Sequence, residues 1–227
     1  MKKHTLLSDI AVFLLIFFLF IVPPFFAVAV SERAGGMFAG WSFPWYQILL
    51  ALVGGVILAF YYDKAKSLDD SCGNMFNVWK RLIVFPVVFT FGMLFAVSLV
   101  CRFLAEVTGL SDGDILVSKP AGILQWVFCL INFFCAAFYE EVLYRFYFSD
   151  ELYNLVTKKH QWRGSLILCE ALGLSVFAFA HLYMGWISVL NAALAHIFLR
   201  LCYKKSGRLW PCVAAHFIYN VISLILL

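Results

Sequence analysis

Two adjacent carboxylates and one guanidinium interrupt an aromatic, otherwise apolar stretch of this sequence. Glu140 and Glu141 are followed by Arg145. In an α-helix Glu141 and Arg145 share a face and can pair, while Glu140 points about 100° away. A carboxylate that is left without a cation can act as a general base in a hydrolase. The same three residues also suit a purely structural ion-pair cluster, so the doublet alone does not decide between the two.

Two further pairs of side chains with helical spacing follow along the chain. Phe177 precedes His181 by four residues, and His216 precedes Asn220 by four residues, so each pair shares a helix face. Polar and ionisable side chains within apolar helices are costly and mark functional sites. Two histidines, an amide and a free carboxylate on three helices predict a converging site.

One glutamate and two histidines are also a plausible ligand set for zinc. The sequence has no H-E-x-x-H motif, and a zinc site leaves Asn220 and the second glutamate less well explained. We therefore favour metal-independent chemistry, with no cofactor expected, and keep a zinc-dependent version as an alternative.

The elements that must position these side chains are membrane helices. Of the 227 residues, 64% are hydrophobic and 13% are charged, whereas soluble domains average about 45 to 50% apolar and about 25% charged residues. This composition excludes a soluble globular protein and a basic nucleic-acid-binding domain. Charge-poor runs that lack the alternation of barrel strands predict an all-α polytopic protein with about seven transmembrane helices. The runs are residues 10–30, 43–62, 82–101, 121–138, 166–180, 186–199 and 209–227.

The distribution of lysine and arginine predicts the orientation in the membrane. With the N-terminus in the cytoplasm and the C-terminus outside, all but three of the 17 Lys and Arg residues lie on the inner side, the exceptions being Arg33, Arg102 and Lys119. This asymmetry follows the positive-inside rule. We divide the chain into N-terminal helices, residues 1–120, and a catalytic helical core, residues 121–227, which holds the predicted cavity.

The depths of the candidate residues constrain the helices. With regular spans Glu140 would lie toward the cytoplasmic end of the fourth helix and His181 toward the outer end of the fifth, about 15 to 20 Å apart in depth. Convergence therefore predicts that the fourth helix continues through Arg145 to about Tyr153, and that the fifth helix is short or sits lower.

The candidate residues resemble the motifs of the CAAX protease and bacteriocin-processing (CPBP, or Abi) family of intramembrane proteases, which includes type II CAAX prenyl endopeptidases. The motifs read Glu140-Glu141-x-x-x-Arg145, Phe177-x-x-x-His181 and His216-x-x-x-Asn220, and the resemblance covers about residues 124–227. It implies a glutamate-dependent endopeptidase with its site in the bilayer. Glu140 would activate water with help from His181, and His216 and Asn220 would stabilise the oxyanion. Glu141, Arg145 and Phe177 would be supporting residues.

The resemblance also implies a substrate, and it leaves competing functions open. The substrate is expected to be a membrane-associated protein or peptide, prenylated if the host makes prenylated proteins, and the absence of eukaryotic sorting signals favours a bacterial inner membrane. One competing class is a non-catalytic scaffold of the same fold that binds a partner, although a scaffold is expected to lose a motif position and none is lost. The other is a small proton-relaying transporter, which should show internal repeats, and we find none.

Overall fold

The apolar runs of the sequence fold into helices. The computed structural model describes residues 6–26, 41–65, 84–109, 119–158 and 162–226, so the predicted outer residue Arg33 lies outside the described residues. The helical elements are α1 (Leu6–Ile16), the π-helix η1 (Phe17–Ile21), the 3₁₀ helix η2 (Pro23–Phe26), α3 (Trp45–Ala65), α5 (Phe85–Thr108), α6 (Ile123–Glu140), the π-helix η5 (Glu141–Phe148), α7 (Ser149–Thr157), α8 (Ser165–Phe179), the 3₁₀ helix η6 (Leu182–Met184), α9 (Trp186–Ser206) and α10 (Trp210–Leu226).

Four helical stretches of the described chain are long and apolar enough to cross a membrane. They are Leu6–Phe26, Phe85–Thr108, Ile123–Thr157 and Trp186–Ser206. The apolar stretches of α3, α8 and α10 are shorter. The 15 residues of α8 extend over about 22 Å, less than the about 30 Å of a bilayer's hydrocarbon core. The protein is a polytopic helical membrane protein, and the total of seven spans stays a prediction.

The outer surfaces of the helices carry large apolar side chains. Phe60, Ile123 and Ile167, on α3, α6 and α8, are 82%, 86% and 73% exposed. Soluble monomers rarely expose contiguous apolar surface of this kind. These faces suit contact with lipid chains, in agreement with an integral membrane protein.

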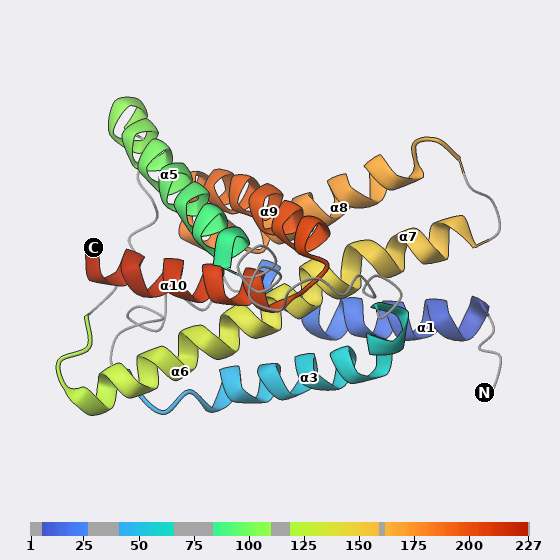
Figure 1. The fold of residues 1–227 in the computed structure, drawn as a ribbon, viewed down its shortest axis with the longest axis horizontal. Helices are drawn as coiled ribbons and strands as arrows, with labels where there is room; N and C mark the ends of the chain where they lie inside the picture. Colours follow the sequence, from blue (N-terminus) through green and yellow to red (C-terminus); the bar gives the residue numbers. More distant parts are fainter. Residues whose placement is uncertain (1–5, 27–40, 66–83, 110–118, 159–161, 227) are drawn as a thin grey trace, which may run out of the picture.

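One continuous helical rod carries the first motif. Ile123–Thr157 forms 35 residues of unbroken helix from α6 through η5 to α7, visible as the long rod that runs diagonally across Figure 1. A helix of this length extends over about 50 Å, so Glu140, the last residue of α6, lies near its middle. The prediction that the fourth helix continues past Arg145 to about Tyr153 is confirmed, and α8 is short, as the same argument required.

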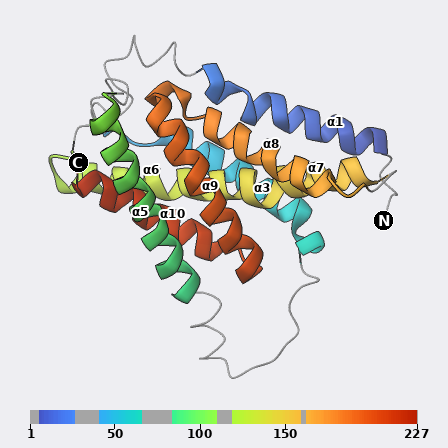
Figure 2. The same cartoon turned by 90° about the horizontal axis from the view of Figure 1, so that it is seen from above.

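The rod forms the centre of the helix bundle. α3 packs along α6 and η5, α10 packs on α6, and α8 packs on α7 and η5. α9 contacts α5, α8, α10 and η5, and Figure 2 shows it running alongside α5. All eight residues of η5 are buried. The first motif is therefore enclosed by helices from several parts of the chain.

α7 and α8 approach each other closely at Gly173. A Cβ atom on this residue would lie 2.3 Å from the Oγ atom of Ser149, and that serine is only 1% exposed. Glycine leaves room for the Ser149 hydroxyl, which would have to turn away or shift if residue 173 carried a Cβ atom. The contact sets the height at which α8 presents Phe177, one turn further along, to η5.

The N-terminal helices share a hydrophobic core with the motif-bearing rod. Phe13 of α1 and Ile57 of α3 pack in the same cluster as Tyr144 and Phe148 of η5. The rings of Phe13 and Phe148 stack with their centroids 5.6 Å apart. The division into residues 1–120 and 121–227 stays a prediction from the sequence.

Candidate active site

The first motif lies at the junction of an α-helix and a π-helix. α6 ends at Glu140 and η5 begins at Glu141. π-helical turns close their hydrogen bonds over five residues instead of four. Such turns are rare in proteins as a whole, but those that occur are often found at functional sites. The sequence prediction assumed a regular α-helix here, so the orientation of these side chains had to come from the structure.

Glu141 is the buried partner of two other motif residues. Its Oε2 lies 3.2 Å from Nε of Arg145, and both side chains have 0% exposure. Its Oε1 lies 2.8 Å from Nδ1 of His216 on α10. The predicted pairing of Glu141 with Arg145 is confirmed, whereas its contact with His216 was not predicted.

Glu140 is the more accessible carboxylate. Its side chain is 27% exposed, and its Oε2 lies 3.9 Å from Nε2 of His216. His216 is thus placed between the two glutamates, bonded to Glu141 through one ring nitrogen and facing Glu140 with the other. One carboxylate is held by partners, and the other faces the histidine across a distance that one water molecule can bridge.

The contact with Glu141 sets the proton arrangement of His216. An ionised carboxylate only accepts hydrogen bonds, so Nδ1 of His216 donates to it. The Nε2 atom then accepts when the ring is neutral and donates when the ring is protonated.

His181 is held in a similar way by its own helix. Its Nδ1 lies 2.9 Å from the main-chain carbonyl of Phe177, and because a carbonyl accepts, this nitrogen donates. Nε2 makes no hydrogen bond within the described ranges and is left for another group. α8 ends at Phe179, and His181 lies two residues later, directly before the 3₁₀ helix η6.

Phe177 connects the second motif to the first. The guanidinium carbon of Arg145 lies 3.9 Å from the centre of the Phe177 ring. On the same ring His181 packs with a centroid distance of 4.8 Å, and Tyr144 meets it edge-on at 5.1 Å. A cation over an aromatic face in a desolvated site contributes about 2 kcal/mol or more. Phe177 therefore orders both Arg145 and His181.

Asn220 is placed by its helix alone. It lies one turn after His216 on α10, so the two side chains share a face of that helix, and it is half-buried. It makes no hydrogen bond to any described residue. The structure thus brings six of the seven candidate residues into one chain of neighbouring side chains, and Asn220 lies one helical turn from His216 in that chain.

Two further polar residues of α9 lie close to the motifs. His196 is 2% exposed, and its ring centroid lies 5.4 Å from that of Phe177. Asn191 donates from Nδ2 to Oη of Tyr219 at 3.2 Å, next to Asn220 in the sequence. Sequence reasoning assigned neither residue to the site.

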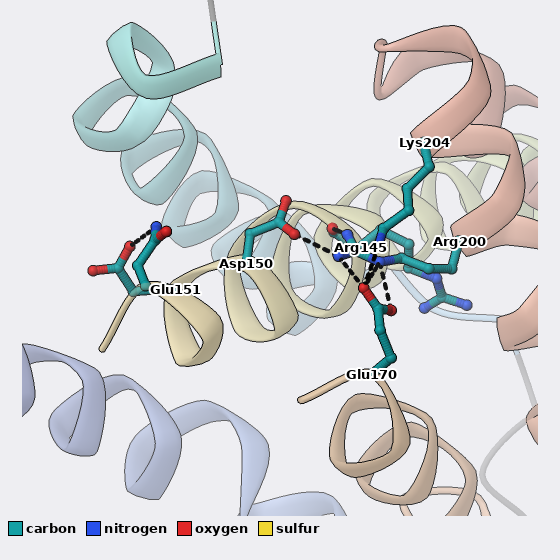
Figure 3. Close-up of polar contacts among 7 residues, drawn as sticks. Arg145, Asp150, Glu151, Glu170, Arg200 and Lys204 are labelled. Atoms are coloured by element: carbon teal, nitrogen blue, oxygen red, sulfur yellow. Dashed lines mark hydrogen bonds and ion pairs between the residues drawn. The ribbon is translucent and has the colours of Figure 1, made fainter. Parts of the chain in front are cut away.

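Sequence reasoning also missed a cluster of charges beside η5. Arg200 of α9 is 5% exposed and pairs with Asp150 of α7 and with Glu170 of α8. Lys204 lies 2.5 Å from the same Glu170, and Figure 3 shows these side chains meeting at one point. A signal was present, because Glu170 lies inside the predicted span 166–180, where an ionisable residue is a functional candidate.

The structure describes no ready-made metal centre. In the ranges that it describes, no three His, Cys, Asp or Glu side chains are grouped so that they could hold a metal ion. The ligand set that suggested zinc was Glu140, His181 and His216. Within that set, His216 has its Nδ1 committed to Glu141 and His181 has its Nδ1 committed to a carbonyl. Metal dependence is a matter for the chelator experiment below.

Two pockets lie along α7, away from the motif residues. Their volumes are about 230 and 430 Å³, and both are lined by Glu151 and Asn154. Tyr61 and Tyr203 also line the smaller one. None of the seven candidate residues lines either pocket, so the catalytic cavity stays a prediction.

The comparisons with known proteins point to one family. Residues 122–222 match the family model described as type II CAAX prenyl endopeptidase Rce1-like. The matched segment contains all seven candidate residues and the helices α6 to α9 that frame them. No curated protein and no solved structure matches the chain.

Proposed function

We propose that this membrane protein, whose residues 122–222 match the family model of type II CAAX prenyl endopeptidases of the Rce1-like kind, is an intramembrane endopeptidase that hydrolyses a peptide bond with a water activated by Glu140. The observation that carries the proposal is the placement of His216 between two unequal carboxylates. Glu141 is fully buried and bound to Arg145, whereas Glu140 is partly exposed and has no cation partner among the described residues other than His216.

Glu140 is the group suited to take the proton from water. In the proposed reaction a water proton moves to Glu140 while the water oxygen attacks the carbonyl carbon of the peptide bond. The tetrahedral intermediate collapses as Glu140 returns the proton to the leaving amine nitrogen and the C–N bond breaks. Positioned general bases of this kind contribute about 10²- to 10⁴-fold in rate.

His216 and Asn220 are the proposed oxyanion donors. With Nδ1 bonded to Glu141 at 2.8 Å, the ring can donate through Nε2 only when it is protonated. In that state Glu140, Glu141, Arg145 and His216 carry two negative and two positive charges, so the buried group is neutral as a whole. The Asn220 amide adds a second donor, and one such donor is worth about 10² to 10³ in kcat.

His181 is proposed to orient the attacking water. Its Nδ1 donates to the Phe177 carbonyl, so the neutral ring presents Nε2 as an acceptor for a water hydrogen. Phe177 packs against this ring and also lies under the guanidinium of Arg145. This division of labour leaves Glu140 to take the other proton.

The finer identity of the substrate is part of the proposal. A membrane-embedded site suits a membrane-associated protein or peptide, and the name of the matched family suggests a prenylated C-terminus. The charge distribution of the sequence favours an orientation with the N-terminus on the cytoplasmic side. A substrate would then reach the site from the bilayer or from its cytoplasmic face.

The test is cleavage of a quenched peptide library, with prenylated members, by the purified protein in detergent. We expect cleavage by the wild type, a loss of about 10²- to 10⁴-fold in Glu140→Ala, and no loss in Glu106→Ala, which alters an exposed glutamate of α5. Activity that survives a strong chelator supports the glutamate-water mechanism, and activity that the chelator abolishes indicates the zinc-dependent version. A wild type that cleaves no peptide would contradict the proposal and favour a partner-binding scaffold.

A further inference from the structure

Arg200 joins three elements around the candidate site. Arg200 Nε donates to Oε2 of Glu170 on α8 at 2.9 Å, and Arg200 Nη2 donates to Oε1 of the same residue at 2.8 Å. Its Nη2 also pairs with Asp150 of α7, and its Nη1 donates to the main-chain carbonyl of Arg145 in η5. Figure 3 shows Arg200 reaching from α9 into this cluster. The side chain of Arg200 is only 6% exposed, whereas its partners Asp150 and Glu170 are 45% and 26% exposed.

The contact with the Arg145 carbonyl is the unusual member of this set. Carbonyls inside a helix normally accept from the N–H four residues later, or five residues later in a π-helix. Arg145 lies four residues before α7 begins at Ser149, where the spacing changes from one pattern to the other. A side-chain donor at this carbonyl supplies a bond where the main-chain ladder changes register, as buried main-chain acceptors require.

The residue whose carbonyl is held also carries a side chain of the site. Arg145 pairs with Glu141 and covers the face of Phe177. A shift of this helical turn would move the guanidinium off the ring and away from the carboxylate. Because Glu141 in turn orients His216, the shift would reach the proposed oxyanion donor.

We propose that Arg200 is a positioning residue for the reaction put forward above, fixing the π-helical register of η5 against α8 and α9. This role rests on the proposed function. The Arg200 side chain itself touches no reacting atom. The planar guanidinium matters here because its fork donates in several directions at once to two carboxylates and one carbonyl, which a lysine ammonium on a flexible stem does not reproduce.

The same cluster contains a matched control. Lys204 lies one turn after Arg200 on α9 and pairs with the same Glu170 at 2.5 Å, but none of its contacts reaches η5 in the described structure. It is also 41% exposed. A role that depends only on the charge of the cluster should be shared by both residues, whereas a role that depends on the carbonyl of η5 belongs to Arg200.

The experiment compares Arg200→Lys and Arg200→Gln with Lys204→Gln in the full-length protein. We expect both Arg200 variants to lower kcat by about 10- to 100-fold, because a small displacement of reacting groups has effects of this size, with KM close to that of the wild type. Lys204→Gln should keep the kcat of the wild type. Thermal stability in detergent, measured for all three variants, separates this effect from unfolding.

A second readout does not depend on activity. Amide hydrogen exchange should become faster at residues 141–149 in Arg200→Lys and stay at the rate of the wild type there in Lys204→Gln. Equal exchange in the two variants, or an Arg200→Lys protein with unchanged kcat, would overturn the positioning role. If the wild type cleaves nothing, the proposed function fails, while the exchange data still decide whether Arg200 holds η5.

Discussion

The two adjacent glutamates are expected to give opposite phenotypes when each is changed to glutamine. Glu140→Gln removes the proposed base and leaves its shape. Glu141→Gln removes the negative charge that faces Arg145 and His216. The side chains of Glu141 and Arg145 are 0% exposed, whereas that of Glu140 is 27% exposed.

The expected magnitudes follow from this difference in burial. Removing one partner of a buried ion pair costs about 3 to 5 kcal/mol, because the other charge stays buried without compensation. At about 2 to 4 °C per kcal/mol for a chain of this size, Glu141→Gln should lower the melting temperature by about 6 to 20 °C. The contact of Glu140 with His216, at 3.9 Å and partly exposed, is worth at most about 1 kcal/mol, so Glu140→Gln should melt close to the wild type.

The assay measures both properties on the same preparations. Detergent-purified variants are heated, and the fraction that remains monodisperse is read by size-exclusion chromatography, while peptide cleavage is measured at a temperature at which both variants are folded. We expect Glu140→Gln to be stable and inactive, with a rate loss of about 10²- to 10⁴-fold. Equal melting temperatures for the two variants would refute the assignment of Glu141 as the buried structural carboxylate, and an active Glu140→Gln would refute the assignment of the base.

Three further outcomes are expected. Gly173→Ala should destabilise the protein and lower activity, because the new Cβ would lie 2.3 Å from a buried serine hydroxyl of α7. Gly54→Ala should be tolerated, because the nearest neighbour of its new Cβ would be 3.5 Å away. Thermal melting of both variants checks this, and equal melting temperatures would contradict it. Asn220→Ala should lower kcat by about 10²- to 10³-fold with little change in melting, as steady-state kinetics would show, and an unchanged kcat would remove it from the oxyanion site. Phe177→Leu should cost about 2 kcal/mol through the lost contact with Arg145, measured as a lower melting temperature, and a variant as stable as the wild type would contradict that contact.

Much of the architecture follows from the sequence alone. Its apolar composition and charge-poor runs predict a polytopic helical membrane protein, and each run contains a helix. The spacing of Glu141 and Arg145 predicts their pairing, which the structure confirms. The mismatch in depth between Glu140 and His181 predicts the extension of the fourth helix, which the structure also confirms.

Contacts between helices were harder to predict. The sequence indicated that His216 belongs near the glutamates, but the choice of Glu141 as its hydrogen-bond partner depends on how α10 is rotated against η5. Arg200 was counted only as an inner-side charge, because its partners on η5, α7 and α8 are 30 to 55 residues away in sequence. No local pattern links residues that far apart.

The sequence by itself determined the membrane environment, the helices and the pairs of motif residues one turn apart, because these depend on composition and on the local geometry of the backbone. Only the tertiary structure decided the π-helical turn at Glu141, the unequal burial of the two carboxylates and the bond from Arg200 to η5. These features arise where helices pack, as at Gly173. A change of side-chain volume or of register at such a contact moves a whole helix face. The three features are therefore set by how distant segments fit together, and not by the sequence of any one segment.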